Sequence, residues 1–341
     1  MYLTEISHFP SFSHFRVASS KPSLPKNFDL ISRSFDENLL RRLKTLNSTS
    51  DPPSISLSWL SLAVDFLSST HAEAQLLISN LGVSSSSEDS LASYLDDAVK
   101  LLDACNSITL EIERLRQRRL LINFVLQLLD FSGEGALVPA PEKLRRARDC
   151  LSDWDNYSRG FSKRSFQNNP EVLIRDLAVG LGNAPRGKIS SVGKLIRRTI
   201  YAVGLVTVFV AGAVASALCG LPEPVRIRVP AEFAWADSFN DMESAISEEL
   251  KRRCFGGEKK GWFREMDDVG TRVKRVCDVI DDLVDKKETL ETAVKELETA
   301  TETFGEGLDR LSNGVNAVFD TVLCTRNGLL DNFRGGLQKH K

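Results

Sequence analysis

The sequence predicts an all-α protein, an elongated bundle of long antiparallel helices with a heptad-patterned C-terminal helix. Three observations lead to this prediction. Apolar residues recur in steps of three and four along several long stretches, which is the period of an amphipathic helix. A seven-residue apolar repeat runs through the last third of the chain. No segment alternates regularly enough between apolar and polar residues to be predicted as a strand.

The first predicted helix begins near Asp51 and Pro52, because aspartate is a good N-cap and proline fits the first helical position. Gly82 is predicted to end it. Between these points one face advances in helical steps through Trp59, Ala63, Phe66, Thr70, Ala74, Leu77 and Leu81.

The second predicted helix is unusually long. Its apolar face begins at Tyr94 and continues to Leu129, before a stretch rich in glycine and proline. Shorter helices are predicted for residues 144–157 and 172–181. Residues 224–230 are flanked by prolines, which favour an extended linker over a sheet strand.

The strongest pattern lies in the C-terminal third, where 15 of 17 heptad positions are apolar and the exceptions are Lys287 and Thr301. If the helix is continuous, it is about 85 Å long, and Gly305 with Gly307 marks the predicted place for a break or hairpin. The repeat favours burial in the bundle core, and a surface offered to a separate partner is the alternative. The two sets of positions are Met266, Val273, Ile280, Lys287, Val294, Thr301, Leu308, Val315, Val322 and Val269, Val276, Leu283, Leu290, Leu297, Phe304, Leu311, Val318.

An uncharged stretch of 23 residues, 199–221, begins at Thr199 and ends at Leu221. Its length meets the roughly 20 residues that a membrane-spanning helix needs. A buried central helix that is apolar on all sides explains the same composition. Small residues four apart favour close helix packing in either case; these are Gly212, Ser216 and Gly220. The sequence leaves both interpretations open.

The predicted domain organisation is simple. Residues 28–335 form a single helical bundle domain that contains the apolar helix at 199–221. Residues 336–341 form a short C-terminal tail. Residues 1–27 form a disordered N-terminal tail, and because this tail is rich in serine and poor in acids, a transit peptide is the alternative.

The composition argues against several classes of function. Lysine plus arginine number 44 and aspartate plus glutamate 46, so the chain lacks the basic excess of a nucleic-acid binder. Six scattered cysteines predict buried, reduced thiols, and neither a disulfide framework nor a metal site. No catalytic motif or cofactor site can be assembled, so no catalytic, cofactor-binding or metal-binding residues are predicted.

Two features that resemble functional motifs are interpreted as structural. Gly182, Gly187 and Lys188 match the start of a phosphate-binding loop, but Ile189 occupies the place of the required serine or threonine. His71 is expected to have a structural or surface role on its helix. The basic clusters are expected to be solvated faces paired with nearby acids, with an anionic lipid or acidic partner as the alternative. They are Arg114, Arg116, Arg118 and Arg119; Lys143, Arg145, Arg146 and Arg148; and Lys251, Arg252, Arg253, Lys259 and Lys260, the last set in an expected exposed loop.

Four stretches resemble the plant BYPASS family. The most distinctive is YLDDAVKLLDACN at residues 94–106. The others are LSW at 57–59, WADSF at 235–239 and LSNGV at 311–315. They follow the family's order and cover the chain from about residue 28 to residue 335.

The resemblance implies a non-enzymatic regulator of plant root and shoot development that restrains a mobile root-derived signal through protein contacts. It implies no cofactor, and an unknown protein partner bound through helical surfaces. The alternatives are a membrane-tethered scaffold in secretion, associated with a membrane through residues 199–221, and a carrier or enzyme for an apolar signalling metabolite. The expected location is the cytoplasm or an endomembrane such as the endoplasmic reticulum, with the chloroplast as the alternative.

Overall fold

The computed structural model describes residues 28–48, 54–81, 88–131, 139–159, 170–220, 225–255, 262–282 and 287–338. These segments contain nine helices and no strand, which confirms the predicted all-α class. The helices are α1 (Phe28–Asn47), α2 (Leu57–Leu81), α3 (Glu88–Leu128), α4 (Pro141–Arg159), α5 (Pro170–Gly180), α6 (Val192–Cys219), α7 (Ala236–Phe255), α8 (Arg264–Asp281) and α9 (Lys287–Gln338).

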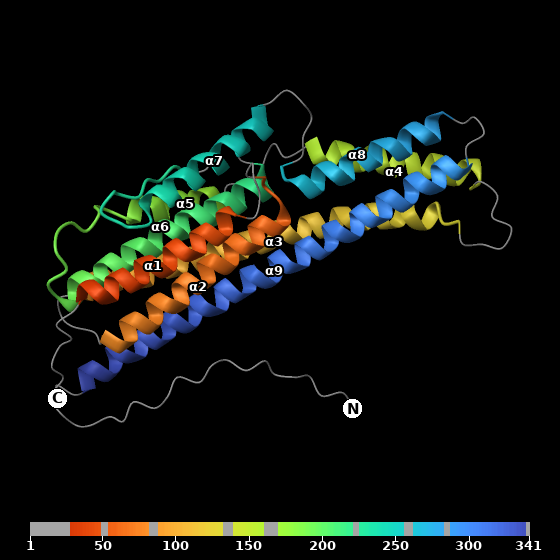
Figure 1. Ribbon diagram of the computed structural model, residues 1–341. Coiled ribbons are helices and arrows are strands. Elements are labelled where there is room, and N and C mark those ends of the chain that lie inside the picture. The colour runs from red at the N-terminus through yellow and green to blue at the C-terminus, as the bar shows by residue number, and fades with distance from the viewer. Residues whose placement is uncertain are drawn as a thin grey trace, which may run out of the picture.

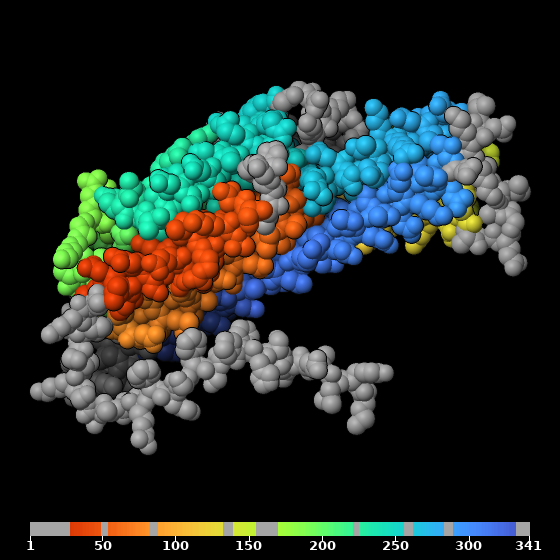
Figure 2. Space-filling model, in the orientation of Figure 1, coloured from red at the N-terminus to blue at the C-terminus, as the bar shows by residue number. Residues whose placement is uncertain are grey.

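The molecule is elongated, and α9 runs along its whole length (Figure 1). α3 lies antiparallel to α9, because Arg116 of α3 pairs with Asp309 and the next turn, at Arg119, meets Gly305. At one end α4 and α8 complete a bundle with α3 and α9, and at the other end α1, α2, α5, α6 and α7 pack together. In the face shown in Figure 2, α1 and α7 form the surface at one end and α8 with the first turns of α9 forms it at the other.

The heptad positions lie in the core, as predicted, but they belong to two helices. Met266 to Ile280 lie on α8 and Leu290 to Val322 on α9, and the two helices pack against each other. The repeat is therefore not carried by one continuous helix, and the length of about 85 Å that continuity would give does not apply. The period continues from α8 into α9 because both helices direct an apolar face toward the same core. Leu283 lies outside the described residues.

The possible break or hairpin at Gly305 and Gly307 does not occur, because α9 passes through both without interruption. These glycines allow close approach of neighbouring helices. A Cβ at Gly305 would overlap the guanidinium group of Arg119, and one at Gly307 would lie 2.7 Å from Leu57 Cδ1 and 2.9 Å from Leu57 Cβ. Packing therefore favours glycine most strongly at Gly307, because Leu57 Cβ is fixed to the backbone of α2, whereas the Arg119 side chain at Gly305 can move.

The apolar stretch forms most of α6, which is the central helix of its end of the bundle. The helix is long and apolar enough to cross a membrane, but 94% of its most apolar 18-residue stretch is buried inside the bundle. Val208 at its centre is 1% exposed, and α1, α2, α3, α5 and α7 all contact the helix. Ser191 caps its N-terminus, and Gly220, with φ of 66°, ends it in the left-handed conformation.

The remaining boundaries show what local signals can and cannot predict. α2 begins at Leu57 and not at Asp51, since Ser56 caps it by accepting a hydrogen bond from the Trp59 N–H at 3.1 Å. Glu265, 208 residues later, accepts one from the Leu57 N–H at 2.9 Å. Residues 225–230 have neither helix nor strand, as predicted.

Replacing Gly307 with alanine is expected to lower the free energy of unfolding by about 1–2 kcal/mol, because Leu57 must move from a closely packed position. Gly328→Ala on the same helix is the matched control, since the nearest atom to its Cβ would be 3.9 Å away. It is expected to raise the free energy of unfolding by up to about 1 kcal/mol, the helix propensity difference. Urea unfolding followed by circular dichroism measures both. Equal effects of the two changes would contradict the close-packing role.

Candidate functional site

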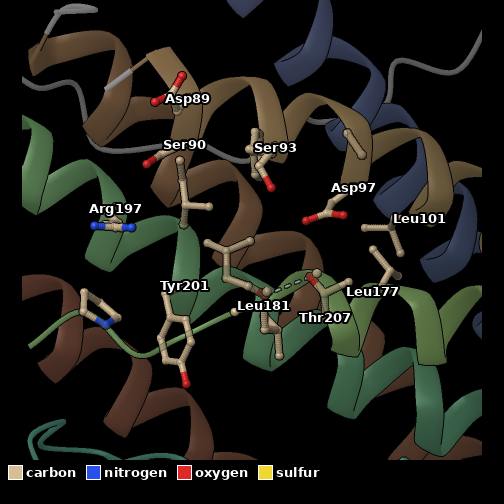
Figure 3. A pocket seen from close by; sticks show the side chains of 18 of the residues that line it. Asp89, Ser90, Ser93, Asp97, Leu101, Leu177, Leu181, Arg197, Tyr201 and Thr207 are labelled. Atoms are coloured by element: carbon tan, nitrogen blue, oxygen red, sulfur yellow. Dashed lines mark hydrogen bonds between the residues drawn. The ribbon is translucent and has the colours of Figure 1, made fainter. Parts of the chain in front are cut away.

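A cavity of about 270 Å³ opens beside α6. Figure 3 shows its walls: α3 contributes Asp89, Ser90, Ser93, Asp97 and Leu101 on one side, and α6 contributes Arg197, Tyr201 and Thr207 on the other. Leu177 of α5 and Leu181 lie between these walls.

The cavity exists because a loop, and no helix, completes its third wall. α5 has only 11 residues and ends at Gly180, and residues 181–190 then connect it to α6. Gly182 adopts a left-handed φ of 60°, which favours glycine. Leu181 points toward Gly204 of α6, where a Cβ would overlap its side chain. Glycine at 204 therefore lets Leu181 reach α6.

The floor of the cavity is a buried polar relay. His71 of α2 lies within 3.1 Å of the Tyr94 hydroxyl through Nδ1 and within 3.0 Å of Thr207 Oγ1 through Nε2. Thr207 donates its one hydroxyl proton to the Val203 carbonyl at 2.8 Å. The hydrogen-bond pattern therefore assigns the proton of His71 to Nε2, which donates to Thr207, while Nδ1 accepts from Tyr94.

Burial sets the protonation of this relay. It lowers the pKa of His71 to about 4, so the imidazole is neutral at physiological pH. Burial also raises the pKa of Tyr94, which stays protonated and donates to His71. The predicted structural role of His71 is thus a core position with both ring nitrogens bonded, on the floor of a cavity.

Charged side chains line the cavity at both ends, since Asp97 lies beside Leu101 and Leu177 and Arg197 lies at the opposite end (Figure 3). Asp97 accepts a hydrogen bond from Lys100 Nζ at 2.9 Å, so its charge is balanced. Asp89 lies in the first turn of α3 on the same wall. Arg197 of α6 is exposed at its end, which we call the mouth, and within the described part of the chain it has no ion pair.

The residues that partly match a phosphate-binding loop lie near the cavity. Gly182 lines the cavity, whereas Gly187 and Lys188 are exposed and do not. Ile189, in the place of the hydroxyl residue, is half-buried. The stretch follows α5 where a phosphate-binding loop would follow a strand, so the structure gives it no phosphate-loop architecture.

A second polar cluster lies at the first turns of α6. Arg198 donates to Asp36 of α1 at 2.9 Å and to Ser32 at 3.1 Å, and its guanidinium lies 3.8 Å above the Phe233 ring. Trp235 donates from Nε1 to the other Asp36 oxygen at 3.1 Å. The buried tryptophan of the WADSF stretch therefore anchors the start of α7 to α1 and α6.

The other stretches of the family resemblance divide between cavity and core. Four members of the 94–106 stretch line the cavity, namely Tyr94, Asp97, Ala98 and Leu101. Leu57 and Trp59 are buried where α2 begins. Leu311 and Val315 are buried on α9, and at Gly314 between them a Cβ would lie 3.2 Å from Val64 of α2.

The basic cluster on α3 is mostly paired with acids, as expected. Arg114 pairs with Glu111, and Arg116 pairs with Glu113 and Asp309. Arg119 lies against Gly305, which leaves it half-buried between α3 and α9.

The cluster on α4 is partly paired. Arg148 binds Asp281 of α8 at 2.8 Å and holds the pKa of that carboxyl below its usual range. Lys143, Arg145 and Arg146 are exposed.

The third basic cluster was predicted wrongly as an exposed loop. Lys251, Arg252 and Arg253 belong to α7, and Arg253 is buried in ion pairs with Glu249 and Asp267, both at 2.7 Å. A helix continues here because the two acids lie in reach of the guanidinium on α7 and α8. Lys259 and Lys260 lie outside the described residues.

The cysteines are all free, in agreement with the expectation of reduced thiols. Burial raises the pKa of Cys105 to about 12, which keeps this thiol protonated. Only Cys105 and Cys219 are buried; Cys150, Cys254 and Cys277 are half-buried and Cys324 is exposed, so the expected burial holds for two of the six. Within the described segments no three His, Cys, Asp or Glu side chains gather as a metal site.

Sequence reasoning missed the cavity. Its lining comes from α2, α3, α5 and α6, and each residue has an ordinary place on its own helix. The available signals were His71 on an otherwise apolar helix face and the glycine pair around Leu181. Neither signal indicates a cavity until the helices are placed.

The fold and the cavity together define a class: helical bundles with a central apolar helix and an internal, partly polar cavity beside it. The chain matches the family described as "Protein ROH1-like" over residues 16–155 and 174–333, so it belongs to that family.

Three relatives illustrate the family. The chain is 33% identical to UPF0496 protein 4 of Oryza sativa subsp. indica over 274 residues, which are 79% of this chain and 59% of that protein. It thus spans about three fifths of that relative's length. It is 28% identical to Protein BPS1, chloroplastic, of Arabidopsis thaliana over 331 residues, 96% of this chain and 90% of that protein. It is 26% identical to Protein ROH1D of Arabidopsis thaliana in an alignment 352 positions long that covers 87% of each chain.

The match to BPS1 confirms the resemblance to the BYPASS family. None of these three names describes an enzyme. No solved structure matches the chain.

Neutral His71 is expected to make stability depend on pH. Its pKa is about 4 in the folded protein and about 6.5 in the unfolded chain, so the unfolded chain binds the proton first as the pH falls. The contribution is complete above pH 6.5 and is lost as the pH falls to 4, by about 3 kcal/mol. Urea unfolding at several pH values measures it, with His71→Gln as the reference. Parallel pH profiles of the two proteins would refute this assignment.

Proposed function

We propose that this protein is a non-enzymatic regulator of plant root and shoot development, which restrains a mobile root-derived signal through protein contacts. One observation carries the proposal: the chain aligns with BPS1 over 96% of its length, and its four BYPASS-like stretches form the structural core and the cavity wall. The names of the relatives support a role without catalysis, since none of the three describes an enzyme.

The partner is proposed to be a protein bound on the helical surface. α3 exposes large apolar side chains, Leu110, Leu120 and Phe124, and Leu120 is 63% exposed. These residues lie on the helix that crosses both ends of the molecule (Figure 1). Several large exposed apolar side chains on one helix are the surface feature that supports a protein contact. No nucleic-acid partner is proposed, because the net charge is −2.

The proposed location is the cytoplasm or the surface of an endomembrane. The name of BPS1 supports the chloroplast as the alternative. A membrane-tethered scaffold in secretion, held through residues 199–221, is the less favoured function. Burial in the bundle accounts for the apolar composition of α6, and the helix supports membrane insertion only by its length and composition.

A carrier for an apolar signalling metabolite is the second candidate function, and the cavity favours it. The cavity lies beside the apolar helix, with Val203, Gly204 and Thr207 in its lining. A small, largely apolar pocket with a few polar groups is the usual form of a small-molecule site. Such binding is compatible with the regulator proposal, because a signal can be restrained by holding it.

Grafting tests the regulator proposal. Rootstocks that lack their own ROH1-like proteins are expected to arrest a wild-type shoot, and expression of this chain in the rootstock is expected to restore leaf growth. A double variant, Leu120→Glu with Phe124→Glu, is expected to restore little growth, because it places charges on the proposed contact surface. Val179→Glu is the control, since Val179 is also exposed but lies on α5. Failure of the wild-type chain would refute the regulator role, and full rescue by the double variant would refute the α3 surface.

Extraction of membranes with alkaline carbonate tests the tether. Because α6 is covered by five helices, the full chain is expected in the soluble fraction after extraction. Retention in the pellet would contradict the buried position of α6 and would favour the scaffold function. Val208→Glu serves as the reference for an unfolded bundle, since it is expected to unfold the protein by placing a charge in its core.

A further inference from the structure

We infer that the cavity binds a small amphipathic carboxylate: a single acid group at the mouth, an extended apolar body and a hydroxyl at the inner end. This inference rests on the second candidate function, the carrier, and names its ligand class. It is carried by three features of the cavity: Arg197, which has no ion pair within the described segments, an apolar passage along α6, and a hydrogen-bond acceptor on the floor.

The acid group is assigned to Arg197. This side chain is exposed and lines the cavity from the second turn of α6. The neighbouring Arg198 is committed to Asp36, whereas Arg197 has no ion pair among the described residues. Asp89 lies on the opposite wall, so a ligand with one negative charge fits better than one with several.

The apolar body is assigned to the passage between mouth and floor. Arg197 and Thr207 are ten residues apart on one helix, which corresponds to about 15 Å. Ile200 and Val203 lie between them on α6, and Leu177 and Leu181 face them. A cavity of about 270 Å³ is at the small end for ligand sites, so it fits one short chain or ring system and excludes a two-chain lipid.

The hydroxyl is assigned to the floor. Tyr94 donates its proton to His71, and Thr207 donates its proton to Val203, so neither hydroxyl has a proton left for a ligand. The Tyr94 oxygen still has acceptor capacity. A buried acceptor is best satisfied by a donor, and a ligand hydroxyl supplies one at the end of the passage.

Isothermal titration calorimetry of the full chain tests this inference with three probes that share a ten-carbon chain: 10-hydroxydecanoate, decanoate and 1,10-decanediol. The hydroxy acid is expected to bind most tightly. Arg197→Gln is expected to weaken both acids by about tenfold or more and to leave the diol unchanged. Lys194→Gln is the matched control, because it removes a charge from the same helix end outside the cavity lining, and it is expected to have little effect.

Two further variants test the inner end. Tyr94→Phe is expected to weaken the hydroxy acid and the diol several-fold and to leave decanoate unchanged. Leu181→Trp is expected to abolish binding of all three probes, because the larger ring fills the passage from a half-buried loop position. Circular dichroism checks that each variant is folded. If Tyr94→Phe does not fold, the comparison of decanoate with the hydroxy acid in the wild-type chain still tests the hydroxyl.

The possible outcomes separate this inference from the regulator proposal. Absence of binding by every probe, equal binding of the diol and the acids, or unchanged binding in Leu181→Trp would each overturn the ligand assignment. None of these results affects the grafting experiment. Rescue of shoot growth by Leu181→Trp would show that restraint of the signal does not need the cavity, whereas failure of the wild-type chain to rescue would leave measured ligand binding intact.

Discussion

The burial of the apolar part of α6 is the constraint on which the rest of this structure depends. A helix with no charge over 23 residues can avoid water in a folded protein only if other helices surround it. Here α1, α2, α3, α5 and α7 do so. Their own polar faces then form the surface, which explains how a chain with an ordinary charged fraction of 26% contains so apolar a centre.

Covering α6 also determines where polar groups can lie. At the start of the helix, Arg198 binds Asp36, and Trp235 binds the same carboxylate, so one buried acid ties α1, α6 and the start of α7 together. Further along, Thr207 is bonded to His71 and through it to Tyr94. Among the described residues, a cavity interrupts this cover where the short α5 ends and a loop follows. The cavity is therefore a consequence of the helix lengths, placed beside a polar relay that the packing already requires.

Much of the fold follows from local sequence, and the parts that do not follow have physical causes. Helical periodicity predicts α3, α4 and α5, and prolines predict the extended linker, because these signals depend on near neighbours. The heptad repeat predicts burial but does not show where α8 ends and α9 begins, since the same period continues through both helices. Local sequence allows a break at Gly305 and Gly307, but these glycines allow α9 to approach Arg119 and Leu57, which are distant in sequence. The cavity needs four helices in place, so no local pattern could indicate it.

The same contacts decide between a core helix and a membrane span for α6. Moving this helix into a bilayer would take Thr207 from His71 and would separate Arg198 from Asp36. Each buried polar group left without its partner costs about 1–3 kcal/mol, and an unpaired charge costs more. It would also expose the faces of five helices that now meet α6, without any helix to replace it. Insertion would gain only contacts with lipid that the core already supplies, so the contacts of α6 favour the bundle.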